Sequence, residues 1–205
     1  MKEKANRHPE DMQLQQECRD KIIESSKSLL ALVNNILDMT KLESGDIALH
    51  EIPFDLIETV IKTNSSYQSQ AEEKGIEYIV DWEKTYLKHT SLIGDPVYVE
   101  KLMGAILSNA IKFTEPGGAI HIWGKETECD NHTVTYSLGC EDTGIGMSKE
   151  FLPHAFDQFT QEHEDGRTKY EGSGLGLAIA KKAVECLGGT IDIQSEKGKG
   201  TSVYI

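Results

Sequence analysis

The chain has 205 residues, of which 38% are apolar and 27% charged, and its formal net charge is −13. This length fits one domain with a helical extension, and the apolar share excludes a wholly disordered chain. Because 34 acidic residues outnumber 21 Lys and Arg residues, nucleic acid is not an expected partner. The sequence has neither a long apolar run nor an apolar N-terminal core, so we expect no membrane span, no signal peptide and no membrane contact.

The four cysteines lack the paired spacing of a metal site. They are Cys18, Cys129, Cys140 and Cys186. We therefore expect buried, reduced thiols in a cytoplasmic protein, and we exclude a metal held through cysteine. Whether a longer parent protein is anchored in a membrane stays open.

Residues 10–43 show one long helical pattern that ends at Ser44-Gly45. Its apolar residues form one stripe, with a second set repeating every seven residues beside it. The stripe is Ile22, Leu29, Val33, Ile36 and Thr40, and the second set is Ile23, Leu30 and Leu37. These faces need a partner, which is either the following domain or a helical bundle formed with a second helix or chain.

Beyond Gly45, helices and strands alternate irregularly. The pattern predicts helices over 54–74, 96–113 and 173–187, with Asp95 as the N-cap of the second. It predicts a strand at 76–80, a hairpin of 119–128 with 133–142, and final strands at 190–195 and 201–205. This order indicates an α/β fold, a two-layer sandwich whose mixed or largely antiparallel sheet is covered by helices on one face.

Two residue clusters are candidates for ligand binding. Asn109 and Lys112 share one face of the helix over 96–113, and an amide and an ammonium group can meet a metal ion and a phosphate. The alternative is that they cap or solvate the helix end. Asp142 follows an alternating strand, and Gly144 and Gly146 allow the backbone to approach a flat ligand, although a tight turn would need the same residues.

A third cluster precedes the last helix. Gly172, Gly174 and Gly176 would present backbone amides and the positive end of a helix dipole to an anion. The spacing is neither that of a dinucleotide-binding fingerprint nor that of a P-loop. Residues 160–171 just before it are polar and without apolar period, which is typical of a lid.

Taken in order, five motifs resemble those of the ATP-binding catalytic domain of sensor histidine kinases, within the ATPase group of gyrase, Hsp90 and MutL. They are the N box (109–114), DTGIGM (142–147), FDQF (156–159), GSGLGL (172–177) and the closing glycine motif (198–201). The resemblance covers about 52–205 and implies the Bergerat ATP-binding fold. The helix ending in LLALVNNILDMTKLESG resembles the second helix of the kinases' dimerisation and phosphotransfer hairpin. The expected division is therefore 1–45 and 46–205.

The resemblance implies a role for each matching residue, with ATP and Mg²⁺ as ligands. Asp142 would accept a hydrogen bond from the adenine amine, Asn109 would help to hold Mg²⁺, and Lys112 would approach the phosphates. The rest of the implied ATP site comprises Gly144, Gly146, Gly172, Gly174, Leu175, Gly176 and Thr201, with Arg167 and Lys169 of the lid as candidate γ-phosphate contacts.

Two departures from the family pattern matter. Ala105 stands where relatives often have Asn or Glu, so we expect weak intrinsic ATP hydrolysis and weakened metal binding. No histidine has the context of the phosphate acceptor, because His8 precedes Pro9 and His50 lies beyond the long helix. We expect a kinase fragment that binds ATP but does not phosphorylate itself. The other histidines, His89, His121, His132, His154 and His163, are expected at the surface.

In the parent, the resemblance implies a homodimer and a response regulator receiver domain as partner. Three alternatives stay open. One is a clamp ATPase of the MutL or Hsp90 type, which Ala105 disfavours. Another is an anti-sigma-type serine kinase, which the long helix disfavours. The last is a pseudokinase that serves as a dimerisation module, which Ala105 and the missing acceptor favour and the intact Asp142 and glycine motifs oppose.

Overall fold

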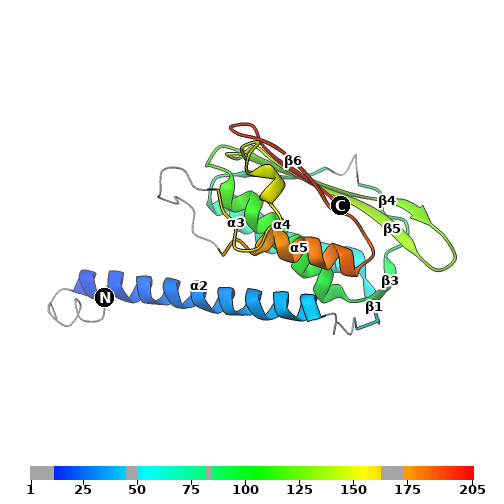
Figure 1. The fold of residues 1–205 in the computed structure, drawn as a ribbon, viewed down its shortest axis with the longest axis horizontal. Helices are drawn as coiled ribbons and strands as arrows, with labels where there is room; N and C mark the ends of the chain where they lie inside the picture. The colour runs from blue at the N-terminus through cyan, green and yellow to red at the C-terminus, as the bar shows by residue number, and fades with distance from the viewer. Residues whose placement is uncertain (1–11, 45–49, 82–84, 163–172) are drawn as a thin grey trace.

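The computed structural model describes residues 12–44, 50–81, 85–162 and 173–205. Figure 1 shows a twisted sheet, a layer of helices against one of its faces, and a long N-terminal helix lying along that helical layer. The sheet has five strands and is mixed. The predicted α/β sandwich is thereby confirmed.

The sheet has the strand order β2-β4-β5-β7-β6. The strands are β2 (Glu77–Val80), β4 (Ala119–Cys129), β5 (Val134–Asp142), β6 (Asp192–Glu196) and β7 (Gly200–Tyr204). β2 pairs with β4 in parallel, and the other pairs are antiparallel. The register places Asp142, the last residue of β5, between Ile120 of β4 and Thr201 of β7. The pairing of β5 with β7 therefore brings together two of the predicted motifs, the one that begins at Asp142 and the one that ends at Thr201.

Three helices cover the sheet: α3 (Leu56–Glu73), α4 (Pro96–Phe113) and α5 (Gly176–Cys186), and a short 3-10 turn, η1 (Leu152–His154), lies outside this layer. Apolar side chains of α4 and α5 meet the inner face of the sheet, where Ile120 is fully buried. A buried aliphatic side chain of this kind contributes about 1.5–3 kcal/mol. Asp95 caps α4 by accepting a hydrogen bond from Val97 N at 3.0 Å, as predicted.

Two helices begin later than predicted. The helix expected over 54–74 begins at Leu56, because Asp55 accepts from Glu58 N at 2.9 Å and so caps it. The residues before it form β1 (Ile52–Asp55), which pairs with β3 (Ser91–Gly94) in a small second sheet that the sequence did not predict. The helix expected from 173 begins at Gly176, because Gly174 has a positive φ of 69° and cannot be helical.

The long helix α2 (Met12–Ser44) is confirmed, and it packs on α5 through a face other than the predicted stripe. Met39 is buried against Leu175 and Ile179, and Asn35 donates to the Ser173 hydroxyl at 3.4 Å. The predicted stripe is exposed instead, with 63% of Leu29 accessible. The following domain therefore covers one side of α2 and leaves its most apolar side free.

None of the helices among the described residues combines the length and apolarity needed to cross a bilayer.

Candidate functional site

The Asp142 carboxylate lies at the end of β5 with one oxygen held and the other available. Oδ1 accepts hydrogen bonds from Gly144 N at 2.8 Å and from Thr201 N at 3.3 Å. Within the described part of the chain, Oδ2 accepts no hydrogen bond. Burial raises the pKa of Asp142 to about 6, against the opposing effect of the two backbone donors. At neutral pH the group is therefore an ionised acceptor in a largely buried position.

Gly144 lies against the end of α4. A Cβ there would come within 2.5 Å of the Phe113 carbonyl oxygen and 2.8 Å of Asp142 Oδ1. The same Phe113 oxygen accepts from Ile145 N at 3.1 Å. No side chain other than hydrogen fits at this position, so the glycine allows the loop after β5 to lie directly against the N-box helix.

The turn between β6 and β7 closes the other side of this loop. Gly146 adopts a φ of 63° and faces the Glu196 carbonyl, and Gly198 N donates to Ile145 O at 2.7 Å. Gly200, with a φ of 107°, brings its backbone against that of Asp142. The glycine motif near the C-terminus thus supports the Asp142 loop, as its place in the predicted site requires.

Ser195 links these segments and was missed by the sequence analysis. Its hydroxyl accepts from Met147 N and donates to Gly200 O, both at 2.9 Å, and lies 2.9 Å from Thr201 Oγ1. Because its single proton goes to Gly200, Thr201 donates to Ser195 and keeps the lone pairs of its own oxygen for a ligand. A serine in an alternating strand has no distinctive spacing, so no sequence signal could have identified it.

Asn109 meets the start of α5, which joins the first and third predicted clusters. The position of a Cβ on Gly176 would be 3.4 Å from Asn109 Nδ2 and 3.6 Å from Oδ1. The amides of the first turn of a helix have no intrahelical acceptor, so the start of α5 can face an anion. The Ala105 carbonyl lies 3.9 Å from the same Cβ position, which puts Ala105 on the same face of α4.

Lys112 lies at the C-terminal end of α4 with its ammonium group 4.5 Å from the centre of the Phe113 ring. Partial burial lowers the pKa of Lys112. Lys74, at the end of α3, fixes this part of α4, because its Nζ donates to the Ile111 and Lys112 carbonyls at 2.7 and 2.9 Å. These are carbonyls that the helix itself leaves without partners.

The two ends of the predicted lid segment meet. Phe159 N donates to Gly174 O at 3.0 Å, and a Cβ on Gly174 would come within 2.8 Å of Thr160 N. Leu175 was predicted to belong to the ATP site, but its side chain is fully buried against Met39 and Ile179. Only its backbone is left for a ligand.

Several predicted residues lie outside the described residues: Arg167, Lys169, Gly172, His8 and His163. All four thiols are free, and Cys18 and Cys140 are buried as expected. The expectation was wrong for Cys129, which is exposed, and Cys186 is only partly buried. The exposed Cys129 lies on the final residue of β4.

Comparison with known proteins is consistent with this geometry. The family model of the histidine kinase-, DNA gyrase B- and HSP90-like ATPases matches residues 94–205. The autoinducer 2 sensor kinase/phosphatase LuxQ of Vibrio parahaemolyticus is 32% identical over 189 residues, which are 91% of this chain and 21% of LuxQ. The sensor histidine kinase GacS of Pseudomonas protegens is 34% identical over 185 residues, 90% of this chain and 20% of GacS.

The crystal structure of full-length ShkA in complex with AMPPNP matches with a TM-score of 0.71 and 26% identity, covering 93% of this chain and 38% of ShkA. The histidine kinase AdeS of Acinetobacter baumannii shares the fold, with a TM-score of 0.65 and 21% identity over 91% of this chain and 82% of AdeS. The chain spans about a fifth of the length of the curated relatives that it matches.

Proposed function

Because the chain belongs to the histidine kinase-, DNA gyrase B- and HSP90-like ATPase family and forms the ATP-binding catalytic part of a two-component sensor histidine kinase, we propose that it binds ATP with Mg²⁺ and delivers the γ-phosphoryl group to a histidine outside residues 1–205. The observation that carries the proposal is the Asp142 carboxylate. Two backbone donors hold Oδ1, and Oδ2 is available to accept from the exocyclic amine of adenine.

A carboxylate at this position would select adenine over guanine. An ionised carboxylate only accepts hydrogen bonds, whereas guanine presents an acceptor where adenine has its amine. The Thr201 hydroxyl, fixed by Ser195 at 2.9 Å, is the proposed second contact to the base. Gly144 and Gly146 would contribute indirectly, because each lets the Asp142 loop pack against a neighbouring carbonyl, that of Phe113 or Glu196.

The phosphates would lie at the start of α5. Asn109 borders this position through Gly176, and an amide oxygen is a suitable Mg²⁺ ligand. When bound, Mg²⁺ would neutralise charge on the phosphates. Lys112 is a candidate cation for the same group, and Gly172 and Gly174, with Arg167 and Lys169, are proposed to close over it. In phosphoryl transfer, positioning and charge neutralisation supply most of the catalysis.

We propose that residues 1–45 are the second helix of the dimerisation and phosphotransfer hairpin and 46–205 the catalytic domain. The proposed partners of the whole protein are a second copy of itself and the receiver domain of a response regulator. The proposed location is the cytoplasm. Since Ala105 offers neither a ligand nor a base beside Asn109, ATP hydrolysis by the chain alone should be slow.

Calorimetric titration with a non-hydrolysable ATP analogue and Mg²⁺ tests the binding proposal. We expect saturable binding at micromolar to millimolar ligand and markedly weaker binding of the GTP analogue. No binding at millimolar ATP analogue would remove the active-kinase proposal. Incubation with γ-labelled ATP tests the location of the acceptor, because acid-labile label on the chain alone would place the acceptor histidine within it.

A second candidate is a pseudokinase that acts as a dimerisation module. Ala105 and the exposed apolar side of α2 favour it, with Leu30 accessible over 62% of its surface. It differs from the first candidate in its nucleotide affinity and in how far that affinity depends on Mg²⁺, so the same titration, repeated without Mg²⁺, separates them. A clamp ATPase of the MutL or Hsp90 type would instead show steady ATP turnover.

A further inference from the structure

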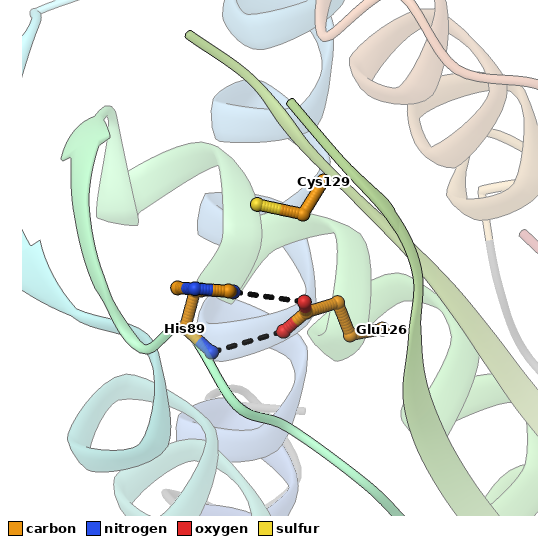
Figure 2. A group of neighbouring side chains, drawn as sticks. All are labelled: His89, Glu126 and Cys129. Carbon is orange, nitrogen blue, oxygen red and sulfur yellow. Dashed lines mark hydrogen bonds and ion pairs between the residues drawn. The ribbon is translucent and has the colours of Figure 1, made fainter. Parts of the chain in front are cut away.

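Three side chains with metal-binding atoms meet at the far end of the β4–β5 hairpin. The ligand atoms of His89, Glu126 and Cys129 all lie within 4.8 Å of one another, and Figure 2 shows the three side chains gathered on one side of the hairpin. Glu126 is six residues along β4 from Ile120, the partner of Asp142. At about 3.3 Å per residue, this cluster lies roughly 20 Å along the strand from the proposed nucleotide site.

A β-bulge places Glu126 and Cys129 on the same face of the strand. Residues three apart on a regular strand point to opposite faces. Here Glu126 pairs with Tyr136 and Cys129 pairs with Val134, two residues away on β5, so Thr127 is an extra residue in β4. The bulge restores the common face, in the way that bulges often re-aim a side chain.

Backbone hydrogen bonds hold His89 opposite this face. Tyr86 bridges to Lys125 alongside β4, and Glu126 N donates to Tyr86 O at 2.7 Å. The Tyr136 hydroxyl donates to the His89 carbonyl. The imidazole Nδ1 lies 2.8 Å from Glu126 Oε1. The imidazole is therefore fixed beside the carboxylate by its own segment and by β5.

The Glu126 carboxylate is preorganised by backbone donors. Its Oε2 accepts from the backbone N–H groups of His89 at 2.9 Å and Lys88 at 3.1 Å. The side chain is only 9% exposed, against 40% for His89. Outer hydrogen bonds of this kind orient the ligands of a metal site and raise its affinity.

We propose that His89, Glu126 and Cys129 bind a Zn²⁺ ion, with water in the fourth position. One nitrogen, one sulfur and one carboxylate oxygen suit zinc, whereas Mg²⁺ and Ca²⁺ take oxygen ligands. Tetrahedral zinc separates such atoms by about 3.3–3.6 Å. His89 Nδ1 and Glu126 Oε1, now 2.8 Å apart, would therefore move slightly apart, and the exposed Cys129 side chain would turn toward them. On binding, the Cys129 thiol loses its proton to solvent, and the imidazole proton resides on Nε2 so that Nδ1 can coordinate.

The proposed site departs from the exclusion of cysteine as a metal ligand, a prediction that rested on spacing along the chain. His89 and Glu126 are 37 residues apart, and only the pairing of the segment at Tyr86 with β4 brings them together. Bound zinc would join this segment, which connects β2 to β3, to the hairpin. Zinc should therefore stabilise the native chain.

Co²⁺ replaces Zn²⁺ in such sites and reports its ligands. The full chain, titrated with Co²⁺ under reducing conditions, should develop a near-ultraviolet thiolate-to-cobalt band and the visible bands of tetrahedral cobalt, and Zn²⁺ should remove both. Cys129→Ser should abolish the ultraviolet band and weaken Zn²⁺ binding at least tenfold in calorimetry. Because Cys129 is exposed, this variant should fold normally, and its metal-free Tm should match that of the parent chain.

Cys186→Ser and His132→Ala are the matched controls, since each removes a donor type away from the cluster, one at the partly buried Cys186 and one at the exposed His132. Both should keep the cobalt spectrum and the rise in Tm that Zn²⁺ produces, whereas Cys129→Ser and His89→Ala should lose them. An absent ultraviolet band at millimolar Co²⁺, an unchanged band in Cys129→Ser, or a band lost in Cys186→Ser would each overturn the proposal.

Discussion

The Asp142 carboxylate has two oxygens with different tasks, and this asymmetry defines a test of base recognition. In Asp142→Asn, the amide oxygen would stay with the Gly144 and Thr201 N–H groups, and the NH₂ group would take the place of Oδ2. A donor would then face the adenine amine. Loss of a charged hydrogen bond costs about 1.5–3 kcal/mol, so ATP affinity should fall about ten- to hundredfold.

Guanine nucleotides provide the control for this variant. The new NH₂ group would suit the guanine oxygen, so Asp142→Asn should bind the GTP analogue as well as or better than the parent chain. Calorimetry with both analogues measures the two effects. Equal losses for ATP and GTP would mean that Asp142 acts on the fold of the loop and not on the base.

The pKa of about 6 for Asp142 predicts a pH dependence of nucleotide affinity. Above this pH the carboxylate is an acceptor, and below it the proton occupies Oδ2, because Oδ1 already accepts two N–H groups. Affinity should thus be lost as pH falls through 6, by about tenfold between pH 7 and pH 5. Calorimetric titrations across this range should show that slope in the parent chain, while Asp142→Asn should lack it.

Lys74 stabilises the end of α4, where Asn109 and Lys112 lie, without belonging to any recognisable motif. Lys74→Met should leave the Ile111 and Lys112 carbonyls without these donors and lower the free energy of unfolding by about 1–3 kcal/mol. Urea unfolding measures this change. Lys62→Met is the matched control, because the exposed Lys62–Glu100 pair at 3.0 Å should contribute less than about 1 kcal/mol. Equal losses in the two variants would contradict this role.

Among the elements, the contact between α2 and α5 depends on one small apolar cluster. Met39 is 5% exposed and packs on Leu175 and Ile179. Met39→Ala should release α2 while the sheet stays folded, since none of the described side chains of α2 belongs to the main core. Hydrogen exchange should become faster over residues 30–44 and stay unchanged in β4 and β5. Lys21→Ala, at an exposed position of α2 outside both apolar sets, should change neither.

Elements with strong local signals were predictable. Asp95 and Pro96 mark the start of α4, alternation marks the β4–β5 hairpin, and the absence of Gly and Pro marks α2. The strands β1 (IPFD) and β3 (SLIG) were missed because Pro53 and Gly94 interrupt their short apolar runs, whereas the equally short β2 lies within the strand-like run of residues 76–80. Their pairing depends on contacts between residues about 40 positions apart, which local sequence does not encode.

The site was predictable as a list of residues but not as an arrangement. Motif order indicated Asp142, Asn109 and the glycines, whereas the support from Ser195 and Lys74 arises only when β6 meets β7 and α3 meets α4. The proposed zinc ligands could not be found from sequence for the same reason, because their common face arises from the bulge at Thr127 and the bridge at Tyr86. Leu175 is the opposite case, because it belongs to a predicted motif but its side chain is buried in an apolar cluster.

Across the whole molecule, the proposed nucleotide site and the proposed zinc site lie at opposite ends of one hairpin, and α2 lies on the other side of the helical layer (Figure 1). α2 contacts the domain through Leu32, Asn35 and Met39 and turns its heptad set outward. A continuous apolar face of this kind, unpaired in a single copy, favours association with a second helix.

The chain should therefore self-associate through α2 at micromolar concentration. Leu30 and Leu37 are 62% and 53% exposed, so Leu30→Glu with Leu37→Glu should place charge in the contact and yield a monomer in sedimentation velocity. Nucleotide affinity should change less than twofold, because neither residue borders the Asp142 loop. Ile93→Glu, which alters an apolar residue 75% exposed on β3, should leave association intact. Association that survives the double change, or that Ile93→Glu abolishes, would assign the contact to another surface.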